Sequence, residues 1–253
     1  MVEFPKFKQT KNLDLSKRNR GKQPKDDQWF APKWHPVLTQ AADDFGYLRS
    51  RQYSDSAILR VVGDRYKLNK RQRNALLRIA ASDQEVLQRK KSMCSPADLQ
   101  GRKVEIDGFN LLILLECALS GGFVFKARDG TYRDISSVHG SYKRVVKTEK
   151  AMVLTGKALQ GLGASSVMWY LDKPVSNSGR LKTMLRELSE QYDFPWEEQL
   201  VYNPDKVLAE SENIVITTDS WILDKVENWF NFGAWLFDVH LKDQANHFEI
   251  IRC

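Results

Sequence analysis

The stretch VEIDGFN, residues 104–110, is followed at once by the apolar run LLILLECAL, residues 111–119. A short run that favours a β-strand therefore ends at Asp107, and a helix is predicted to begin just beyond it. Aspartate is a good helix N-cap, because its carboxylate accepts the free N–H groups of the first turn. A carboxylate at the carboxyl end of a strand is also well placed to hold a metal ion. This stretch alone supports both interpretations.

Beyond residue 103, short strand-like runs alternate with helical stretches. Because strands interleaved with helices favour a mostly parallel sheet covered by helices, we predict an α/β fold over residues 103–253. The run FVFKARDGTYRDI, residues 123–135, departs from this pattern, since Asp129-Gly130 is a turn signal between two short strands. We therefore predict a β-hairpin inserted into the α/β domain.

The N-terminal part of the chain has a different composition. Residues 1–33 are rich in Lys, Asn, Gln and Pro and predict a basic arm, while residues 34–95 predict a small all-α domain. Within this domain the turn GDRYKLN, residues 63–69, precedes a basic helix, which is compatible with a helix-turn-helix. Basic outer faces are also common on helical hairpins that touch no nucleic acid, so the pattern leaves both interpretations open.

Charge is distributed unevenly along the chain. Residues 1–103 carry 23 Lys and Arg against 11 Asp and Glu, whereas residues 104–253 carry 16 against 21. A basic segment beside an acidic one suits a protein that binds a polyanion and places carboxylates next to it. No apolar run approaches the roughly 20 residues that span a bilayer, and the three cysteines match no zinc-site spacing. We expect a soluble cytoplasmic protein with no membrane partner; the oligomeric state is left open.

Three of the predicted strands end in aspartate, at Asp107, Asp172 and Asp219. Ligand sites in parallel sheets lie beyond the carboxyl ends of the strands, so these carboxylates are predicted to gather at one edge. Crowded carboxylates repel one another, and oxygen ligands of this kind suit Mg²⁺ or Mn²⁺. Asn110 and Asp224 are candidates to position the metal or a water molecule. Glu149, in an amphipathic helix, is a further candidate ligand. It is better placed than Glu116, for which we predict an exposed helix edge.

Several basic and hydroxyl residues are candidates for contact with a nucleic acid backbone. Those of the helical domain lie around its basic helix, and those of the α/β domain lie near helix starts, where phosphate binds readily. His139 lies among basic residues and is a candidate general acid or phosphate contact, with an inert loop position as the alternative. The predicted nucleic-acid-binding residues are Arg65, Lys70, Arg71, Arg73, Lys143, Arg144, Ser176 and Ser178.

The motifs VEIDGFN, VMWYLDKPVSNSG and NIVITTDSWILD resemble the strand-end motifs of the PIN-like nuclease superfamily, particularly its NYN-type branch. The resemblance covers roughly residues 103–240. It implies a Rossmannoid parallel sheet and a carboxylate cluster with Mg²⁺ or Mn²⁺, and it often accompanies activity on RNA. It carries Asp107, Asn110, Asp172 and Asp219 over as metal-site residues. The whole chain also resembles an uncharacterised family in which a helical segment precedes the α/β half.

These observations predict a metal-dependent nuclease that acts on nucleic acid, RNA more than DNA, with a basic helical module on the phosphate backbone. One alternative is a binding protein that keeps a PIN-like scaffold without catalysis. Another is a metal-dependent phosphatase for a small substrate, although such a substrate needs no extended positive surface.

Overall fold

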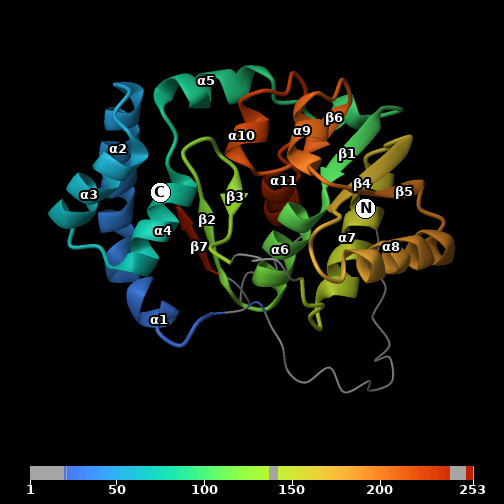
Figure 1. The fold of residues 1–253 in the computed structure, drawn as a ribbon, viewed down its shortest axis with the longest axis horizontal. Coiled ribbons are helices and arrows are strands. Elements are labelled where there is room, and N and C mark those ends of the chain that lie inside the picture. The colour runs from blue at the N-terminus through green and yellow to red at the C-terminus, as the bar shows by residue number, and fades with distance from the viewer. Residues whose placement is uncertain (1–19, 21, 137–141, 240–248, 253) are drawn as a thin grey trace.

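The computed structural model describes residues 20, 22–136, 142–239 and 249–252. An N-terminal group of helices lies beside an α/β region, and α5 runs along the top of both in Figure 1. In chain order the elements are α1 (Asp26–Trp29), η1 (Pro32–Trp34), α2 (His35–Ser50), α3 (Asp55–Arg65), α4 (Lys70–Ile79), α5 (Asp83–Lys91), η2 (Pro96–Leu99), β1 (Lys103–Asp107), α6 (Gly108–Leu119), β2 (Phe123–Lys126), β3 (Tyr132–Arg133), α7 (Thr148–Gly161), β4 (Ser166–Asp172), α8 (Ser178–Tyr192), β5 (Trp196–Val201), α9 (Pro204–Ala209), β6 (Ile214–Ile216), α10 (Ser220–Leu223), α11 (Phe232–Val239) and β7 (Glu249–Arg252).

The main sheet has four strands in the order β5-β4-β1-β6, and all of its pairings are parallel. Helices cover it, so the predicted α/β class with a mostly parallel, helix-flanked sheet and a preceding helical region is confirmed. Asp107 pairs in register with Tyr170, and Ile106 pairs with Ile216. The carboxyl ends of β1, β4 and β6 therefore meet at one edge of the sheet.

Successive side chains of the strands enter two different cores, as the alternation of a β-strand requires. Ile214 and Ile216 of β6 join Trp169 in the large core under α6, α7 and α8. Val215 and Tyr170 point to the opposite face, where a smaller core lies beneath α9 and α10. This two-sided burial explains why the strands read as apolar runs, and it fixes α9 and α10 beside the carboxyl edge.

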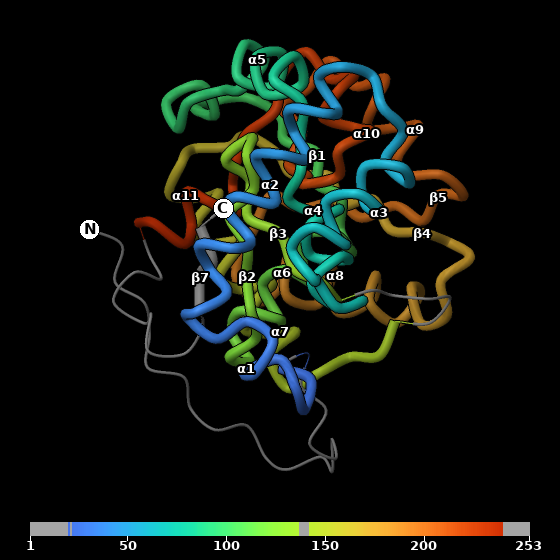
Figure 2. The backbone as a smooth tube through the Cα atoms, turned by 90° about the vertical axis from the view of Figure 1, so that its left-hand side faces the viewer, coloured from blue at the N-terminus to red at the C-terminus, as the bar shows by residue number. Residues whose placement is uncertain are grey.

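The helices α2, α3 and α4 pack on a second sheet, with strand order β3-β2-β7. Phe123 and Phe125 of β2 are buried against these helices, and Phe30 contacts both rings at centroid distances of 5.2 and 5.0 Å. Figure 2 shows α2 and α4 in front of β2 and β3. The antiparallel pairing of β2 with β3 around Gly130, which has a φ of +80°, confirms the predicted hairpin. The helical region thus packs against the hairpin.

Side-chain caps begin two helices of the helical region. Ser54 and Asn69 cap α3 and α4, and Asn69 forms a reciprocal capping box with Gln72. The part of the predicted basic arm that the structure describes is attached here, because Phe30 lies fully within the core. Across the described ranges, no helix is both long enough and apolar enough to cross a membrane.

Candidate carboxylate site

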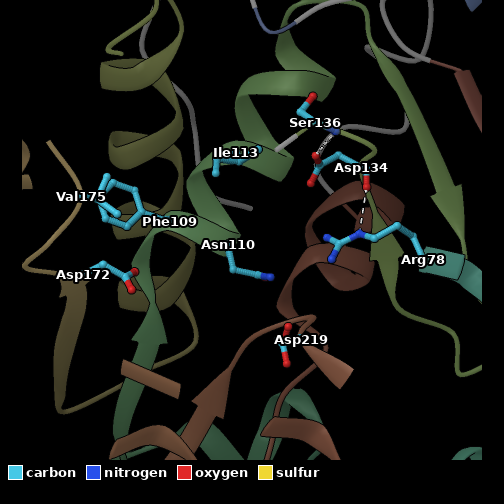
Figure 3. Close-up of a pocket in the computed structure, with 9 residues that line it drawn as sticks. All are labelled: Arg78, Phe109, Asn110, Ile113, Asp134, Ser136, Asp172, Val175 and Asp219. Atoms are coloured by element: carbon cyan, nitrogen blue, oxygen red, sulfur yellow. Dashed lines mark hydrogen bonds between the residues drawn. The ribbon is translucent and has the colours of Figure 1, made fainter. Parts of the chain in front are cut away.

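A pocket of about 330 Å³ opens at the carboxyl edge of the main sheet. Side chains from the sheet edge, α6, the hairpin and α4 face it in Figure 3. One wall is apolar and comes from α6 and the segment after β4, while the other walls are polar. The pocket is lined by Arg78, Phe109, Asn110, Ile113, Asp134, Ser136, Asp172, Val175 and Asp219.

Asp107 is almost fully buried at the base of this edge. Its carboxylate caps α6 by accepting the Asn110 backbone N–H at 3.4 Å, and it also accepts the Thr217 hydroxyl at 2.9 Å. Burial raises the pKa of Asp107 to about 7. The hydrogen bond from Thr217 lowers this pKa, whereas the charges of Asp205 and Asp219 raise it. The structure thus shows the capping role of Asp107, and its raised pKa follows from burial beside other acidic groups.

Thr217 and Asn110 tie the ends of β1 and β6 together. Thr217 donates its hydroxyl to Asp107 and accepts the Asp219 backbone N–H at 3.0 Å. The amide oxygen of Asn110 accepts both the backbone N–H and the hydroxyl of Thr218 at 2.9 Å. This leaves the amide nitrogen of Asn110 directed into the pocket, as Figure 3 shows. The sequence-predicted Asn110 is thus part of the pocket wall, with its oxygen already used.

Asp219 and Asp172 bring carboxylates to the pocket from two further strand ends. Asp219 caps the short helix α10, because its carboxylate accepts the N–H groups of Trp221 at 2.9 Å and Ile222 at 3.4 Å. Asp172 ends β4 and is half-buried, and that burial raises its pKa. Both residues line the pocket, so the structure brings two of the three predicted aspartates to its surface and places Asp107 close behind.

A fourth carboxylate, Asp205, belongs to the same group. It lies in the first turn of α9, directly after β5, where Asn203 caps the helix. Burial raises the pKa of Asp205, and the charges of Asp219 and Asp172 raise it further. The sequence analysis missed Asp205. A signal was present, because the strand-like run EEQLVYN precedes a helix start of the form Asn-Pro-Asp.

The four aspartates interact through their charges without enclosing an ion. The charges of Asp205 and Asp219 raise the pKa of Asp107, and the charges of Asp219 and Asp172 raise the pKa of Asp205. Among the residues that the structure describes, however, no three His, Cys, Asp or Glu side chains converge closely enough to hold one metal ion. The edge is therefore a concentration of acidic groups that raise one another's pKa.

A cation from the helical region faces these acids across the pocket. Arg78, near the end of α4, donates from Nε to the Asp134 carbonyl at 3.3 Å. Its guanidinium group is directed toward Asn110 and the pocket interior in Figure 3. Asp134 is itself buried, and burial raises its pKa. Arg78 lies on the polar face of the basic helix and was not among the predicted binding residues.

Two family models and one curated protein match parts of the chain. A family model described as a domain of unknown function (DUF5616) matches residues 96–235, which is more than half of the chain. The chain belongs to this family. A second model, described as a protein of unknown function (DUF434), matches residues 37–92. The uncharacterized protein MJ0935 of Methanocaldococcus jannaschii is 36% identical over 191 residues, covering 76% of this chain and 90% of that protein. No solved structure matches the chain.

The matched ranges fit the division drawn from the sequence. The DUF5616 range contains β1 and the carboxylate edge, and the DUF434 range contains the helices α2 to α5. The predicted resemblance to an uncharacterised family, in which a helical segment precedes an α/β half, is confirmed. The family descriptions name no activity. The chemistry of the DUF5616 part must therefore be inferred from the residues of this chain.

Two of the arginines predicted to bind phosphate are engaged inside the helical region. Arg71 forms a bidentate ion pair with Asp26, at 3.1 and 3.0 Å, and donates to the Ile135 carbonyl. Arg73 donates to the carbonyl groups of Leu68 and Leu59 and pairs with Asp64. Their guanidinium groups therefore hold the helices and the N-terminal segment together, which differs from the predicted role.

The other predicted backbone contacts are spread over the surface. Arg65 is exposed and lies 3.5 Å from Asp44, and Lys70 is exposed at the start of α4. Lys143, Arg144 and Ser176 are exposed near the start of α8, whereas Ser178 is buried and donates to the Lys173 carbonyl at 3.4 Å. His139 lies outside the described residues. None of these predicted contacts that the structure describes, from Arg65 to Ser178, is among the residues that line the pocket.

The remaining predicted ligands, Asp224 and Glu149, lie apart from the carboxylate group. Asp224 forms an ion pair with the buried Arg89 at 2.6 Å, so its carboxylate faces α5. Glu149 is exposed in the first turn of α7 and does not line the pocket. Glu116, which was expected at an exposed edge, is instead fully buried. It accepts hydrogen bonds from Arg20, Tyr142 and Thr148, so its charge serves to anchor the loop before α7.

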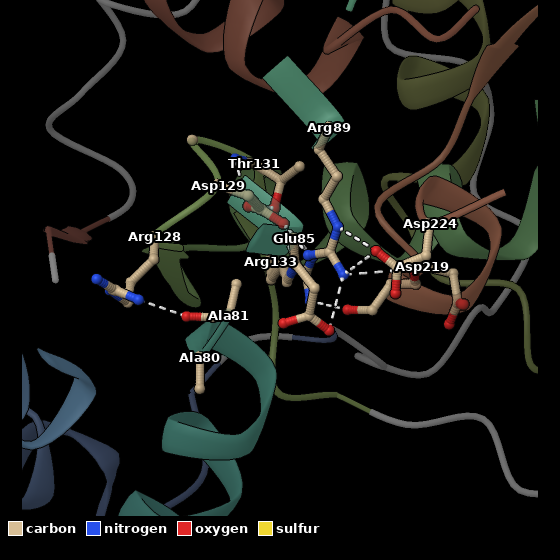
Figure 4. Close-up of polar contacts among 12 residues, drawn as sticks. Ala80, Ala81, Glu85, Arg89, Arg128, Asp129, Thr131, Arg133, Asp219 and Asp224 are labelled. Atoms are coloured by element: carbon tan, nitrogen blue, oxygen red, sulfur yellow. Dashed lines mark hydrogen bonds and ion pairs between the residues drawn. The ribbon is translucent and has the colours of Figure 1, made fainter. Parts of the chain in front are cut away.

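A buried network of ion pairs around Arg89, Asp129 and Arg133, part of which Figure 4 shows, is connected to the segment that carries Arg78. Arg133 donates to the Arg78 carbonyl at 2.8 Å, to the Ser220 hydroxyl at 2.7 Å and to Asp129 at 2.7 Å. Arg89 also binds Asp129, at 2.6 Å. Arg133 thus connects the segment carrying Arg78 with the helix that begins beside Asp219, and the inserted hairpin supplies this connection.

Proposed function

We propose that this protein is a metal-dependent nuclease that acts on RNA. The observation that carries the proposal is the group of four aspartates at one edge of a parallel sheet, in which burial raises the pKa of Asp107 and Asp205 and like charges raise it further. A group of this kind is costly to ionise in a folded protein unless a cation binds there. The resemblance of the strand-end motifs to PIN-like nucleases supports the same chemistry.

The donor set suits Mg²⁺ or Mn²⁺ better than zinc, because every candidate ligand is an oxygen. Mg²⁺ keeps several of its waters and commonly uses only one or two carboxylates. This habit fits an edge where, within the described ranges, no three acidic side chains converge on one point. We propose that one or two of Asp172, Asp205 and Asp219 bind the cation directly, that the others reach it through its waters, and that Asp107 lies behind them. When bound, the cation lowers the pKa of water and neutralises charge on a phosphodiester.

The protein's own residues perform the remaining work. Arg78 faces the acidic edge from the opposite wall and contacts a phosphate oxygen, for which a guanidinium group is well suited. The amide nitrogen of Asn110 donates to the same substrate group. Asp107, with its pKa near 7, exchanges a proton in the neutral pH range. Arg133 acts through Arg78 and Ser220 and is a positioning residue.

Cleavage of mixed RNA in the presence of Mn²⁺ tests the proposal. Asp219→Asn and Asp107→Asn are expected to lower the rate by about 100-fold or more, a magnitude typical of lost charge stabilisation at an active site. The matched control is Asp193→Asn, an exposed C-cap residue of α8 with a φ of 53°, a conformation that asparagine tolerates. Equal rates in the wild type and both pocket variants would remove the proposed chemistry.

The second candidate function is binding of nucleic acid without cleavage. It is favoured by the absence, in the described residues, of three acidic groups at one coordination point. Binding that weakens steeply with salt, in the presence of Mn²⁺ but with no cleavage product, would select this function.

A further inference from the structure

A second cavity, of about 480 Å³, lies on the outer side of the carboxylate edge. It is formed by α9 and α10, which lie next to each other in Figure 1. These are the two helices whose first residues follow β5 and β6, so the cavity adjoins Asp205 and Asp219 along the chain. It is lined by Asn203, Lys206, Ala209, Glu210, Trp221 and Lys225.

Trp221 is the large aromatic residue of this cavity, and half of its surface is exposed (50%). Its position is fixed, because its backbone N–H donates to the Asp219 carboxylate at 2.9 Å. The Lys225 Nζ lies 4.6 Å from the centre of the ring. A tryptophan that is held at its backbone while its ring faces solvent offers a flat surface to a ligand.

A second exposed aromatic residue lies at the carboxyl end of β5, which pairs with β4. Tyr202 follows β5 and is 75% exposed, and the Lys173 Nζ lies 4.7 Å from its ring centre. Lys173 directly follows Asp172. An exposed ring with a lysine over it is therefore found at two places near the site, Trp221 with Lys225 after β6 and Tyr202 with Lys173 after β5 and β4.

This combination matches the chemistry of an unpaired nucleotide. Aromatic rings stack on bases of any sequence, and lysines attract the phosphates between them. Lys206 shares its charge with Glu210, at 4.0 Å, so Lys225 is the stronger cation of the cavity. A protein partner fits less well, because the lining is mostly polar and charged around one ring, whereas the centres of protein interfaces are contiguous and apolar.

We propose that the cavity between α9 and α10 is a subsite for an unpaired nucleotide of the substrate, with its base stacked on Trp221 and its phosphate near Lys225. This nucleotide would be next to the nucleotide that lies at the carboxylates. The position of the subsite along the substrate therefore rests on the proposed function. The subsite itself requires only binding.

Binding of a labelled single-stranded oligoribonucleotide, measured by anisotropy in EDTA at low salt, tests the subsite without cleavage. Trp221→Ala is expected to weaken binding by about 10-fold, within the range for loss of one stacked base. Trp221→Phe is expected to restore most of the affinity, because it keeps an aromatic face. The matched control is Tyr53→Ala, which removes an aromatic ring that is 57% exposed in the helical region.

A series of oligonucleotides, each with one abasic position, identifies the stacked base. One abasic position is expected to weaken binding to the wild type and to have no further effect on Trp221→Ala. Unchanged affinity in Trp221→Ala, or failure of the wild type to bind any oligonucleotide, would overturn the subsite. Cleavage that depends on Asp219 but not on Trp221 leaves the proposed function standing without the subsite. Binding that depends on Trp221 without any cleavage leaves the subsite standing alone.

Discussion

Asp129 and Asp107 are both buried aspartates, and they lie in two regions with opposite electrostatics. Burial alone raises the pKa of Asp129, but Arg133, Thr131 and Arg89 reverse the shift and hold it below the ordinary value. Burial raises the pKa of Asp107 to about 7, and its acidic neighbours add to the shift. The first region is a closed network of opposite charges that stabilises the fold. The second keeps like charges together, which is a cost to the fold and a reason to expect a bound cation.

The largest effect is expected from breaking the closed network. Arg89→Met leaves Asp129 and Asp224 with one cation fewer in a buried site, and removal of one partner from such a site costs about 3–5 kcal/mol. Urea unfolding measures this loss. The control is Arg65→Met, which breaks an exposed pair with Asp44 and is expected to change stability by about 0.5 kcal/mol or less. A similar small change in both variants would show that the network does not stabilise the fold.

The opposite sign is expected at Asp107. Its native pKa of about 7 lies above the ordinary value of 3.8, so the folded state keeps a proton that the unfolded chain releases between these values. The contribution of Asp107 to the stability of the wild type therefore falls as pH rises from about 4 to about 7. Asp107→Asn removes this loss and is expected to stabilise the protein by about 2–4 kcal/mol at about pH 8, with little effect at about pH 4.

Urea unfolding of Asp107→Asn across this pH range, without divalent cations, checks the prediction. Asp193→Asn, at an exposed helix end, serves as the control and is expected to show no pH-dependent difference from the wild type. A stability difference for Asp107→Asn that is constant with pH would mean that Asp107 has no raised pKa.

The two regions also differ in how much of each can be predicted from the sequence. Asp107, Asp172 and Asp219 could be placed together, because each ends an apolar run and parallel strands carry their ends to one edge. Asp205 could not be placed as easily, because β5 is partly exposed and the turn after it resembles an ordinary loop. The sheet class and the hairpin were predictable because their signals are local.

Charge pairing was much harder to predict. The pattern of α4 shows which face is polar, but not that Arg71 meets Asp26, 45 positions away, or that Arg78 turns toward the pocket. The spacing of Asp224 from Asp219 predicts a metal ligand. In the structure Asp224 pairs instead with Arg89, which is 135 positions away. Such partners are set by tertiary packing, which a helical repeat does not encode.

A smaller effect is expected at Arg78, the cation that joins the two regions. Arg78→Gln is expected to weaken RNA binding by about 5- to 10-fold and to lower the salt slope by about 1, as for loss of one phosphate contact. Anisotropy titrations at several salt concentrations measure both quantities. Arg65→Gln is the control, because Arg65 is a basic residue of the same helical region that does not line the pocket. Equal losses in the two variants would show that binding is spread over the basic surface.

Binding of Mn²⁺, followed by loss of the electron paramagnetic resonance signal of the free ion, tests the central claim most directly. The wild type is expected to bind the ion, more tightly at about pH 8 than at about pH 5, because Asp107 and Asp205 then ionise more completely. Asp205→Asn and Asp219→Asn are expected to weaken binding about 10-fold or more, while Asp193→Asn is expected to match the wild type. A free-ion signal that the wild-type protein leaves unchanged would contradict the account.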